Sequence, residues 1–443
     1  MGNARRAAVL AGIAAAGLAL ASLDTPPRTQ ITLPPSIHSS FPFFIGAWVG
    51  PRTAPDDPEA WRRFARAGLE VSFRPLEDSN DRAHNLATLA LLDSMGLAML
   101  PRDSAVHPDE TRRPGWRERV RDVVAAYRGH RSLFGYFVAD EPQPDESDSV
   151  AAIAAEFRAR DPRHSAYVNL LPPAENATDA AQARWRTDAA RMIERGHLGL
   201  WSWSAYSQRR SGEGAAFLLT QRNALQVGRA TGVPGIAVLQ FTGFADLDPL
   251  PRAQLDYLAA ESIAHGARGI VWFTWWTPDP NEPGQHWRGG AIEYDGTPTA
   301  RADTLALVNE RARALAGEFL EASGDLRSVR LAHLGGAMPK GAPIPGDRIP
   351  GLLRVAGGPS TVAARWFNGD VRWLVINRDR AQGHTFTLGL AQETGVGNVF
   401  DPDSARWHAH DPARRSVVLA LPPGGSAVLG IVAPLQPRRR SGV

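Results

Sequence analysis

The sequence contains no cysteine and a single lysine, Lys340, among its 443 residues. Without cysteine the chain has no disulfides, no thiol chemistry, no zinc–thiolate site and no lipoprotein anchor. Its stability must therefore come from a packed core, and 43% hydrophobic with 21% charged residues is typical of a globular protein. A chain of this length can form one large domain and a second, smaller one.

Several motifs are also absent. The sequence has no Gly-x-Ser-x-Gly elbow, and no His/Asp/Glu spacing typical of a zinc or iron site. No Gly-x-Gly-x-x-Gly turn follows the first strand-like run, which weighs against a dinucleotide-binding open sheet. We therefore predict no cofactor and no metal. Three histidines, His164, His197 and His265, have the placement of helix ends or loops, and we assign them no role.

The basic residues include five at the two ends of the chain: Arg5, Arg6, Arg438, Arg439 and Arg440. Without these five, the 49 basic residues become 44, against 46 acidic residues. The body of the chain is thus near neutral, which argues against a nucleic-acid partner.

The N-terminal residues have the pattern of a secretory signal peptide. A charged start is followed by an apolar run from Ala7 to Leu20 and by an Ala-x-Ala site at Ala19–Ala21. We predict a signal peptide over 1–21, a linker over 22–40, and export to the periplasm or the cell exterior. No membrane span would remain after cleavage. The alternative is a retained anchor, because Ala7–Leu23 is long enough to cross a bilayer.

Apolar strand-like runs alternate with amphipathic helical stretches between residues 41 and 320. The helical period is clear over Arg117–Tyr127 and Leu305–Leu315, where apolar residues share one face. The strand-like runs begin near Pro42, Leu69, Leu97, Leu133, Ser165, Leu198, Gly235 and Arg268. Eight such units predict a (β/α)8 barrel over 41–320, with a doubly wound open sheet as the competing fold.

The pattern changes after Leu320. Short alternating runs separated by turn residues predict a small antiparallel β-sandwich over 321–433, followed by a basic tail over 434–443. The stretch Gly335–Gly351 is rich in Gly and Pro, which favours a loop. The predicted strands cover Ala363–Phe367, Arg372–Asn377, His384–Leu390, Arg406–Ala409, Ser416–Leu421 and Ala427–Val432.

The segment Gly135–Pro142 carries the strongest functional signal. An apolar run ends in Asp140 and Glu141, and Pro142 must stop the strand because proline has no N–H for a sheet ladder. An exposed turn before the next helix is the alternative. As the fourth of eight runs, however, this segment would deliver both acids to the face where such barrels hold their active sites.

The ends of the other runs are rich in aromatic and polar residues. Flat rings suit the faces of sugars, and amides can both donate to and accept from hydroxyl groups. We predict a carbohydrate partner and make no prediction of oligomeric state. Any of the tryptophans could instead fill the layer between strands and helices, and the amides could cap loops. The predicted substrate-binding residues are Trp48, Arg74, Asn169, Trp203, Tyr206, Gln240 and Trp276.

Together these residues resemble the clan A glycoside hydrolases, the (β/α)8 enzymes of the β-galactosidase and cellulase type. The resemblance implies that Glu141, at the end of the fourth strand, is the general acid/base. The C-terminal region resembles the accessory β domain common behind such barrels. A narrower similarity to secreted bacterial proteins assigned as glycoside hydrolases rests on Gly135–Pro142, Val168–Pro172, His265–Ile270, Phe273–Pro278 and Gly290–Thr299.

One position departs from that clan. Its nucleophile is a glutamate at the end of the seventh strand, where this chain has Gln240. In a regular strand Asp140 would point away from Glu141, so only an irregular strand end would let both face the pocket. Three hypotheses stay open: two-carboxylate hydrolysis, substrate-assisted hydrolysis by the Asp140/Glu141 pair as in β-hexosaminidases, and noncatalytic sugar binding. For the first, the candidate second acids are Asp140, Glu77, Asp78, Asp103, Asp246 and Glu293.

Overall fold

The computed structural model describes most of the chain between residues 43 and 432. The predicted signal peptide, linker and basic tail lie outside the described residues, as does Arg74. None of the described helices combines the length and the apolar character needed to cross a membrane. The described ranges are 43–52, 57–73, 81–174, 176–206, 208–209, 212–213, 216–320, 326–335, 348–367 and 370–432.

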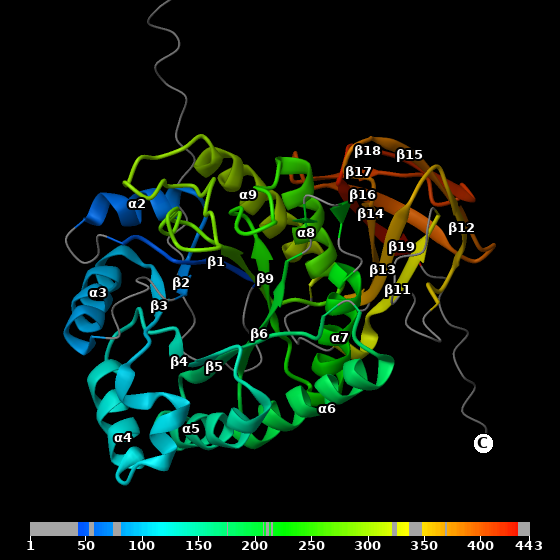
Figure 1. The fold of residues 1–443 in the computed structure, drawn as a ribbon. Coiled ribbons are helices and arrows are strands. Elements are labelled where there is room, and N and C mark those ends of the chain that lie inside the picture. Colours follow the sequence, from blue (N-terminus) through cyan, green and yellow to red (C-terminus); the bar gives the residue numbers. More distant parts are fainter. Residues whose placement is uncertain are drawn as a thin grey trace, which may run out of the picture. The chain divides into compact units, whose positions relative to one another are not determined.

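Eight parallel strands form the predicted barrel (Figure 1). They pair in the order β4, β5, β6, β9, β10, β1, β2, β3, and short parallel bridges, Met99 with Leu133 and Arg102 with Phe137, join the last strand to the first. The fold class is therefore confirmed. The strands are β1 (Phe44–Trp48), β2 (Val71–Phe73), β3 (Ala98–Leu100), β4 (Gly135–Asp140), β5 (Ser165–Leu170), β6 (Leu200–Ala205), β9 (Ile236–Gln240) and β10 (Gly269–Phe273).

Helices alternate with these strands, as the apolar period predicts. The two clearest predictions correspond to α4 and α9, and α4 buries Val120, Val123, Val124 and Tyr127 on one face. The helices are α2 (Pro58–Arg66), α3 (Arg82–Met95), α4 (Trp116–Tyr127), α5 (Ser147–Arg160), α6 (Asp179–Gly196), α7 (Ala216–Thr231), α8 (Arg252–Ala264) and α9 (Arg301–Phe319). Short β7 (Gln208–Arg209) and β8 (Gly212–Glu213) pair between β6 and α7.

Aromatic rings fill the interior of the barrel. The Trp48 ring lies 5.7 Å from that of Phe137 and 6.5 Å from that of Tyr167, and Phe73 lies 5.1 Å from Tyr167, measured between ring centroids. Gly46 on β1 makes room for them, because a Cβ there would lie 3.0 Å from the Phe73 ring. The interior is thus a packed core, which leaves the strand ends for chemistry.

The C-terminal residues form two antiparallel sheets, in the orders β11-β13-β14-β19-β16-β17 and β12-β15-β18. Trp373 and Val362 from the first sheet share a core with Phe386 and Val417 from the second, which confirms the predicted β domain. Three of its strands were not predicted: β11, β12 and β16. The strands are β11 (Arg330–Leu334), β12 (Leu352–Ala356), β13 (Ser360–Phe367), β14 (Asp370–Asn377), β15 (His384–Leu390), β16 (Gly395–Asp401), β17 (Arg406–Ala409), β18 (Ser416–Leu421) and β19 (Ser426–Val432).

Helices α8 and α9 make polar contacts between barrel and β domain. Arg311 on α9 contacts both carboxylate oxygens of Asp403 at 2.9 Å, and Arg372 on β14 contacts Glu318 at 3.0 Å. On α8, Glu261 accepts a hydrogen bond of 2.6 Å from the Thr361 hydroxyl. Charged and hydroxyl groups of the sheet therefore have partners on barrel helices.

Candidate active site

Strand β4 ends irregularly at the two adjacent acids. Its register against β5 shifts between Phe137 and Ala139, and Glu141 has a φ of 49°. The Glu141 N–H nevertheless donates to the Asn169 carbonyl at 2.9 Å, so the chain still follows β5. A bulge followed by a left-handed residue changes the direction in which the side chains point. As a result, Asp140 and Glu141 join one network of side chains on neighbouring strands.

That network runs in one direction. Ser202 donates to Asn169 Oδ1 at 2.6 Å, and its own oxygen lies 2.6 Å from the Tyr167 hydroxyl, which is then the donor. The Asn169 amide has two hydrogens, and it donates them to Asp140 Oδ1 at 2.9 Å and Ser204 Oγ at 3.1 Å. Ser204 donates its single hydrogen to Glu141 Oε1 at 2.7 Å. Each hydrogen in this series of hydrogen bonds has one acceptor, and each of the two carboxylates accepts one hydrogen bond from the network.

Burial favours the protonated form of Glu141. It raises the pKa of Glu141 above the ordinary value; the hydrogen bond from Ser204 opposes this rise, and the negative charge of Asp140 adds to it. Burial, assisted by the charges of Glu141 and Asp140, also raises the pKa of Tyr206 well above its usual value. A carboxyl group whose pKa is raised by burial and by a neighbouring negative charge is suited to donate a proton.

Aromatic rings continue from Tyr206 across the following loops. The Tyr206 ring lies 5.4 Å from Phe244 and 5.2 Å from Phe273, and Phe244 lies 4.9 Å from Trp287. The indole N–H of Trp287 donates to Glu282 at 2.6 Å. Phe244 and Trp287 were not predicted, because they lie in loops where strand periodicity gives no guide. These rings offer the apolar surface that sugar faces require.

The structure does not bring Trp203 to this network. Its ring lies 5.5 Å from Trp201, and both rings pack over Gly235, where a Cβ would lie 2.7 Å from either. Ser202 and Ser204 point the other way, toward the acids, because side chains alternate along β6. Trp203 therefore belongs to the packing outside the strands, which was the alternative for any tryptophan.

Three other predicted residues have structural contacts of their own. Trp48 is buried in the barrel interior, among the rings described above. Gln240 is buried and donates to the Asp248 carbonyl at 2.6 Å, which caps the loop after β9. Trp276 donates to the Tyr294 carbonyl at 3.3 Å within its own loop. Of the predicted substrate-binding residues, Asn169 donates to Asp140, and Tyr206 lies close enough to both acids for their charges to raise its pKa.

Among the candidate second acids, Asp140 shares the network of Glu141. Asp103 is committed elsewhere, since it pairs with Arg82 at 2.8 Å and accepts from the Tyr127 hydroxyl at 2.8 Å. Asp246 is exposed, and Glu293 lies near Thr277 in the loop after β10. Glu77 and Asp78 lie outside the described residues.

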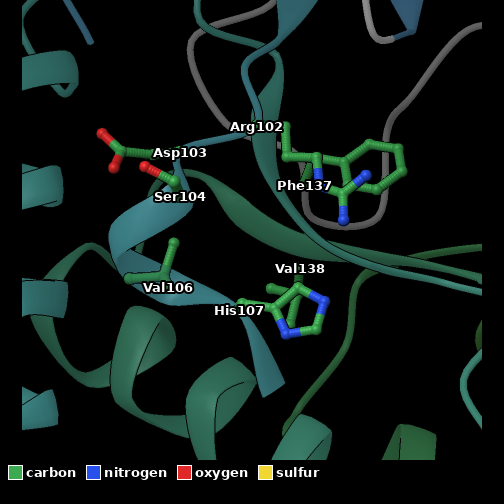
Figure 2. Close-up of a pocket in the computed structure, with 7 residues that line it drawn as sticks. All are labelled: Arg102, Asp103, Ser104, Val106, His107, Phe137 and Val138. Atoms are coloured by element: carbon green, nitrogen blue, oxygen red, sulfur yellow. The ribbon is translucent and has the colours of Figure 1, made fainter. Parts of the chain in front are cut away.

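A small cavity of about 190 Å³ lies between the segment that follows β3 and residues of β4 (Figure 2). The Arg102 guanidinium lies over the Phe137 ring, 5.8 Å from its centroid. Neither Asp140 nor Glu141 lines this cavity. We place the candidate active site at these two acids and not at the cavity, because the acids bring two carboxylates together. The lining residues are Arg102, Asp103, Ser104, Val106, His107, Phe137 and Val138.

Comparison with known proteins supports the fold assignment alone. No family and no curated protein matches the sequence. A solved glycoside hydrolase aligns with a TM-score of 0.56 at 11% identity, covering 88% of this chain and 92% of the other. A family 5 glycoside hydrolase from Bacteroides vulgatus ATCC 8482 also gives 0.56 at 11% identity, covering 88% and 89%. The chain has a glycoside hydrolase-like (β/α)8 fold. At this identity the similarity extends to neither substrate nor catalytic residues.

Proposed function

We propose that the protein is a glycoside hydrolase in which Glu141 is the general acid. The observation that carries this proposal is the pair of carboxylates at the end of β4, where burial and the Asp140 charge raise the pKa of Glu141. The glycoside hydrolase-like fold agrees with it, and the rings around Tyr206 offer a surface for a carbohydrate substrate.

The hydrogen bonds indicate how Glu141 would act. Because Oε1 accepts from Ser204, Oε2 is the oxygen that would carry the proton. Glu141 would give this proton to the glycosidic oxygen as the bond from that oxygen to the anomeric carbon breaks. Water then supplies a hydroxyl group to the anomeric carbon, and its remaining proton returns to the Glu141 carboxylate.

We propose Asp140 as the second acid. It would act as a charge beside the developing oxocarbenium ion, or hold a substrate group that performs the attack. These two roles differ in substrate requirement, since the second needs a nucleophilic substituent such as an acetamido group next to the anomeric carbon.

The buried Gln240 favours a second candidate function. It leaves the end of β9 without a charge, so a noncatalytic carbohydrate-binding barrel is the alternative. The signal-peptide pattern over 1–21 supports the further proposal that the protein is exported and meets its glycan in the periplasm or outside the cell.

The test is reducing-sugar release from a panel of oligosaccharides and polysaccharides with and without acetamido groups. We expect the wild-type chain to release sugar from at least one glycan. The Glu141→Gln variant should bind that glycan in affinity electrophoresis while its turnover falls by about a hundredfold or more. Binding without turnover by the wild type would support the second candidate, and turnover unaffected by Glu141→Gln would overturn the role of Glu141.

A further inference from the structure

A second cluster of chemically active side chains lies away from the acids of β4, where α8 contacts the C-terminal β domain. Glu261 on α8 and His265 at its C-terminal end are one turn apart, and His333 lies on β11. All three are buried, with exposed fractions of 0%, 2% and 7%. One carboxylate oxygen and one nitrogen from each imidazole lie within 4.8 Å of one another.

Three of the four imidazole nitrogens in this cluster have no hydrogen-bond partner among the described residues. His265 Nδ1 lies 2.8 Å from the Glu261 main-chain carbonyl, so Nδ1 carries the hydrogen and Nε2 has a lone pair. Within the described part of the chain, neither His265 Nε2 nor either ring nitrogen of His333 has a hydrogen-bond partner. A buried polar nitrogen without a partner is unfavourable, so a bound ion or water is expected to satisfy it.

The donor set matches a transition-metal site. Two imidazoles and one carboxylate are a common set for Zn²⁺, with a water molecule in the fourth position. Partners also orient two of the ligands, since Thr361 donates to Glu261 Oε1 at 2.6 Å and His265 Nδ1 is bound to a carbonyl.

We propose that Glu261, His265 and His333 bind a first-row divalent cation, with Zn²⁺ the best fit, which links barrel helix α8 to strand β11. Bonds of about 2.0–2.2 Å in a tetrahedron place ligand atoms roughly 3.4 Å apart. Ligand atoms that lie within 4.8 Å of one another would therefore approach by up to about 1.4 Å on binding the ion. From the sequence we assigned His265 no role, because nothing there pairs it and Glu261 with His333.

Nearby positive charges limit the affinity of such a site. Arg222 and Arg378 act electrostatically on His333, and Arg229 acts on His265. These guanidinium groups oppose a cation, and the Glu261 carboxylate supplies the compensating charge. Glu261→Gln should therefore weaken binding more than loss of either imidazole.

The experiment measures zinc binding by the purified full-length chain after chelator treatment. With a chromophoric competitor, we expect one Zn²⁺ per chain and a higher thermal unfolding midpoint when zinc is added. His265→Gln and His333→Gln should each lower the affinity at least tenfold. His384→Ala is the matched control, because His384 lies in the same β domain and pairs with Asp379 at 3.0 Å, outside this cluster. This control should keep full zinc binding.

Other outcomes would overturn the proposal. Folded wild-type chain that binds no zinc at micromolar concentration excludes the site. Zinc binding that survives His333→Gln places the ion elsewhere. If the variants do not fold, as judged by circular dichroism, Co²⁺ added to the wild-type chain decides the matter. Visible absorption of four-coordinate cobalt with nitrogen ligands supports the site, and absorption of hexaaqua cobalt alone excludes it.

Discussion

The ends of β4 and β9 lie in the same barrel sheet but present opposite chemistry. Strand β4 delivers Asp140 and Glu141 to a hydrogen-bond network shared with Asn169 and Ser204. Strand β9 ends in Gln240, whose amide donates to the Asp248 carbonyl of its own loop. The first end holds negative charge, and the second holds a loop in place.

Under the proposed function, β4 alone supplies both acids. The glycoside hydrolases that the sequence resembles take their acids from the fourth and seventh strands. Here the bulge in β4 and the left-handed backbone of Glu141 let consecutive residues join one network. The irregular strand end thus allows a pair of carboxylates that a regular strand would separate.

Removal of the proton donor should have the largest effect. We expect Glu141→Gln to lower kcat by about 10²–10⁴-fold, the usual contribution of a general acid, with little change in glycan affinity. Steady-state kinetics on the glycan found by the panel provide the measurement. Glu118→Gln, at an exposed position in the first turn of α4, is the control and should keep wild-type activity.

Asp140→Asn tests whether the neighbouring charge matters. The loss should be about a hundredfold in kcat/KM if Asp140 acts as the second acid. Because the Asp140 charge raises the pKa of Glu141, its removal lowers that pKa, so the alkaline limb of the pH profile should move to lower pH. The exposed Asp145→Asn should leave the profile unchanged. An unchanged profile in Asp140→Asn would show that the two carboxylates act independently.

Gln240→Glu places a carboxylate at the end of the seventh barrel strand, where the clan A glycoside hydrolases have their nucleophile. The new group would face the Asp248 carbonyl without a hydrogen to donate, and we expect a loss of about 1–3 kcal/mol in the free energy of unfolding at pH 7. Burial should raise the pKa of the new carboxyl group in the folded state. The loss should therefore shrink as the pH falls and the group becomes protonated. Urea denaturation of the wild type and the variant at pH 7 and pH 4 measures the difference in the free energy of unfolding. An unchanged free energy of unfolding at pH 7 would contradict the loop-capping role of Gln240.

Ser204→Ala should have the smallest effect. The Ser204 hydrogen bond favours ionised Glu141, so its loss raises the pKa of Glu141 and moves the alkaline limb to higher pH. This shift is opposite in sign to that of Asp140→Asn. We expect kcat/KM to change by less than about tenfold, since one hydrogen bond contributes about 0.5–1.5 kcal/mol. If the alkaline limbs of Ser204→Ala and Asp140→Asn moved equally and in the same direction, the opposite effects proposed for Ser204 and Asp140 on the pKa of Glu141 would be wrong.

Sequence patterns were sufficient for the barrel and for the position of Glu141 at the end of its fourth strand, but not for side-chain direction. The strand period places Trp201 and Trp203 on the same face of β6, but it does not tell which face is directed toward the acids. In the structure Ser202 and Ser204 point toward the acids, and the two tryptophans pack on the other side. The unpredicted strand β16 contains Gly395 and Gly397, which weaken the alternating pattern. Its pairing with β17 and β19 comes from long-range contacts that no local pattern records.

By itself, the sequence determined the alternation of strands and helices, the acids at the end of the fourth strand and the amide at the end of the seventh. These follow from periodicity and from the chemistry of proline, glutamate and glutamine, which are local properties. Only the tertiary structure decided that Asp140 and Glu141 share one network, that Gln240 caps a loop and that Glu261, His265 and His333 meet. Each of these depends on a bulge, a strand register or a contact between distant segments, where packing of the whole chain selects the arrangement.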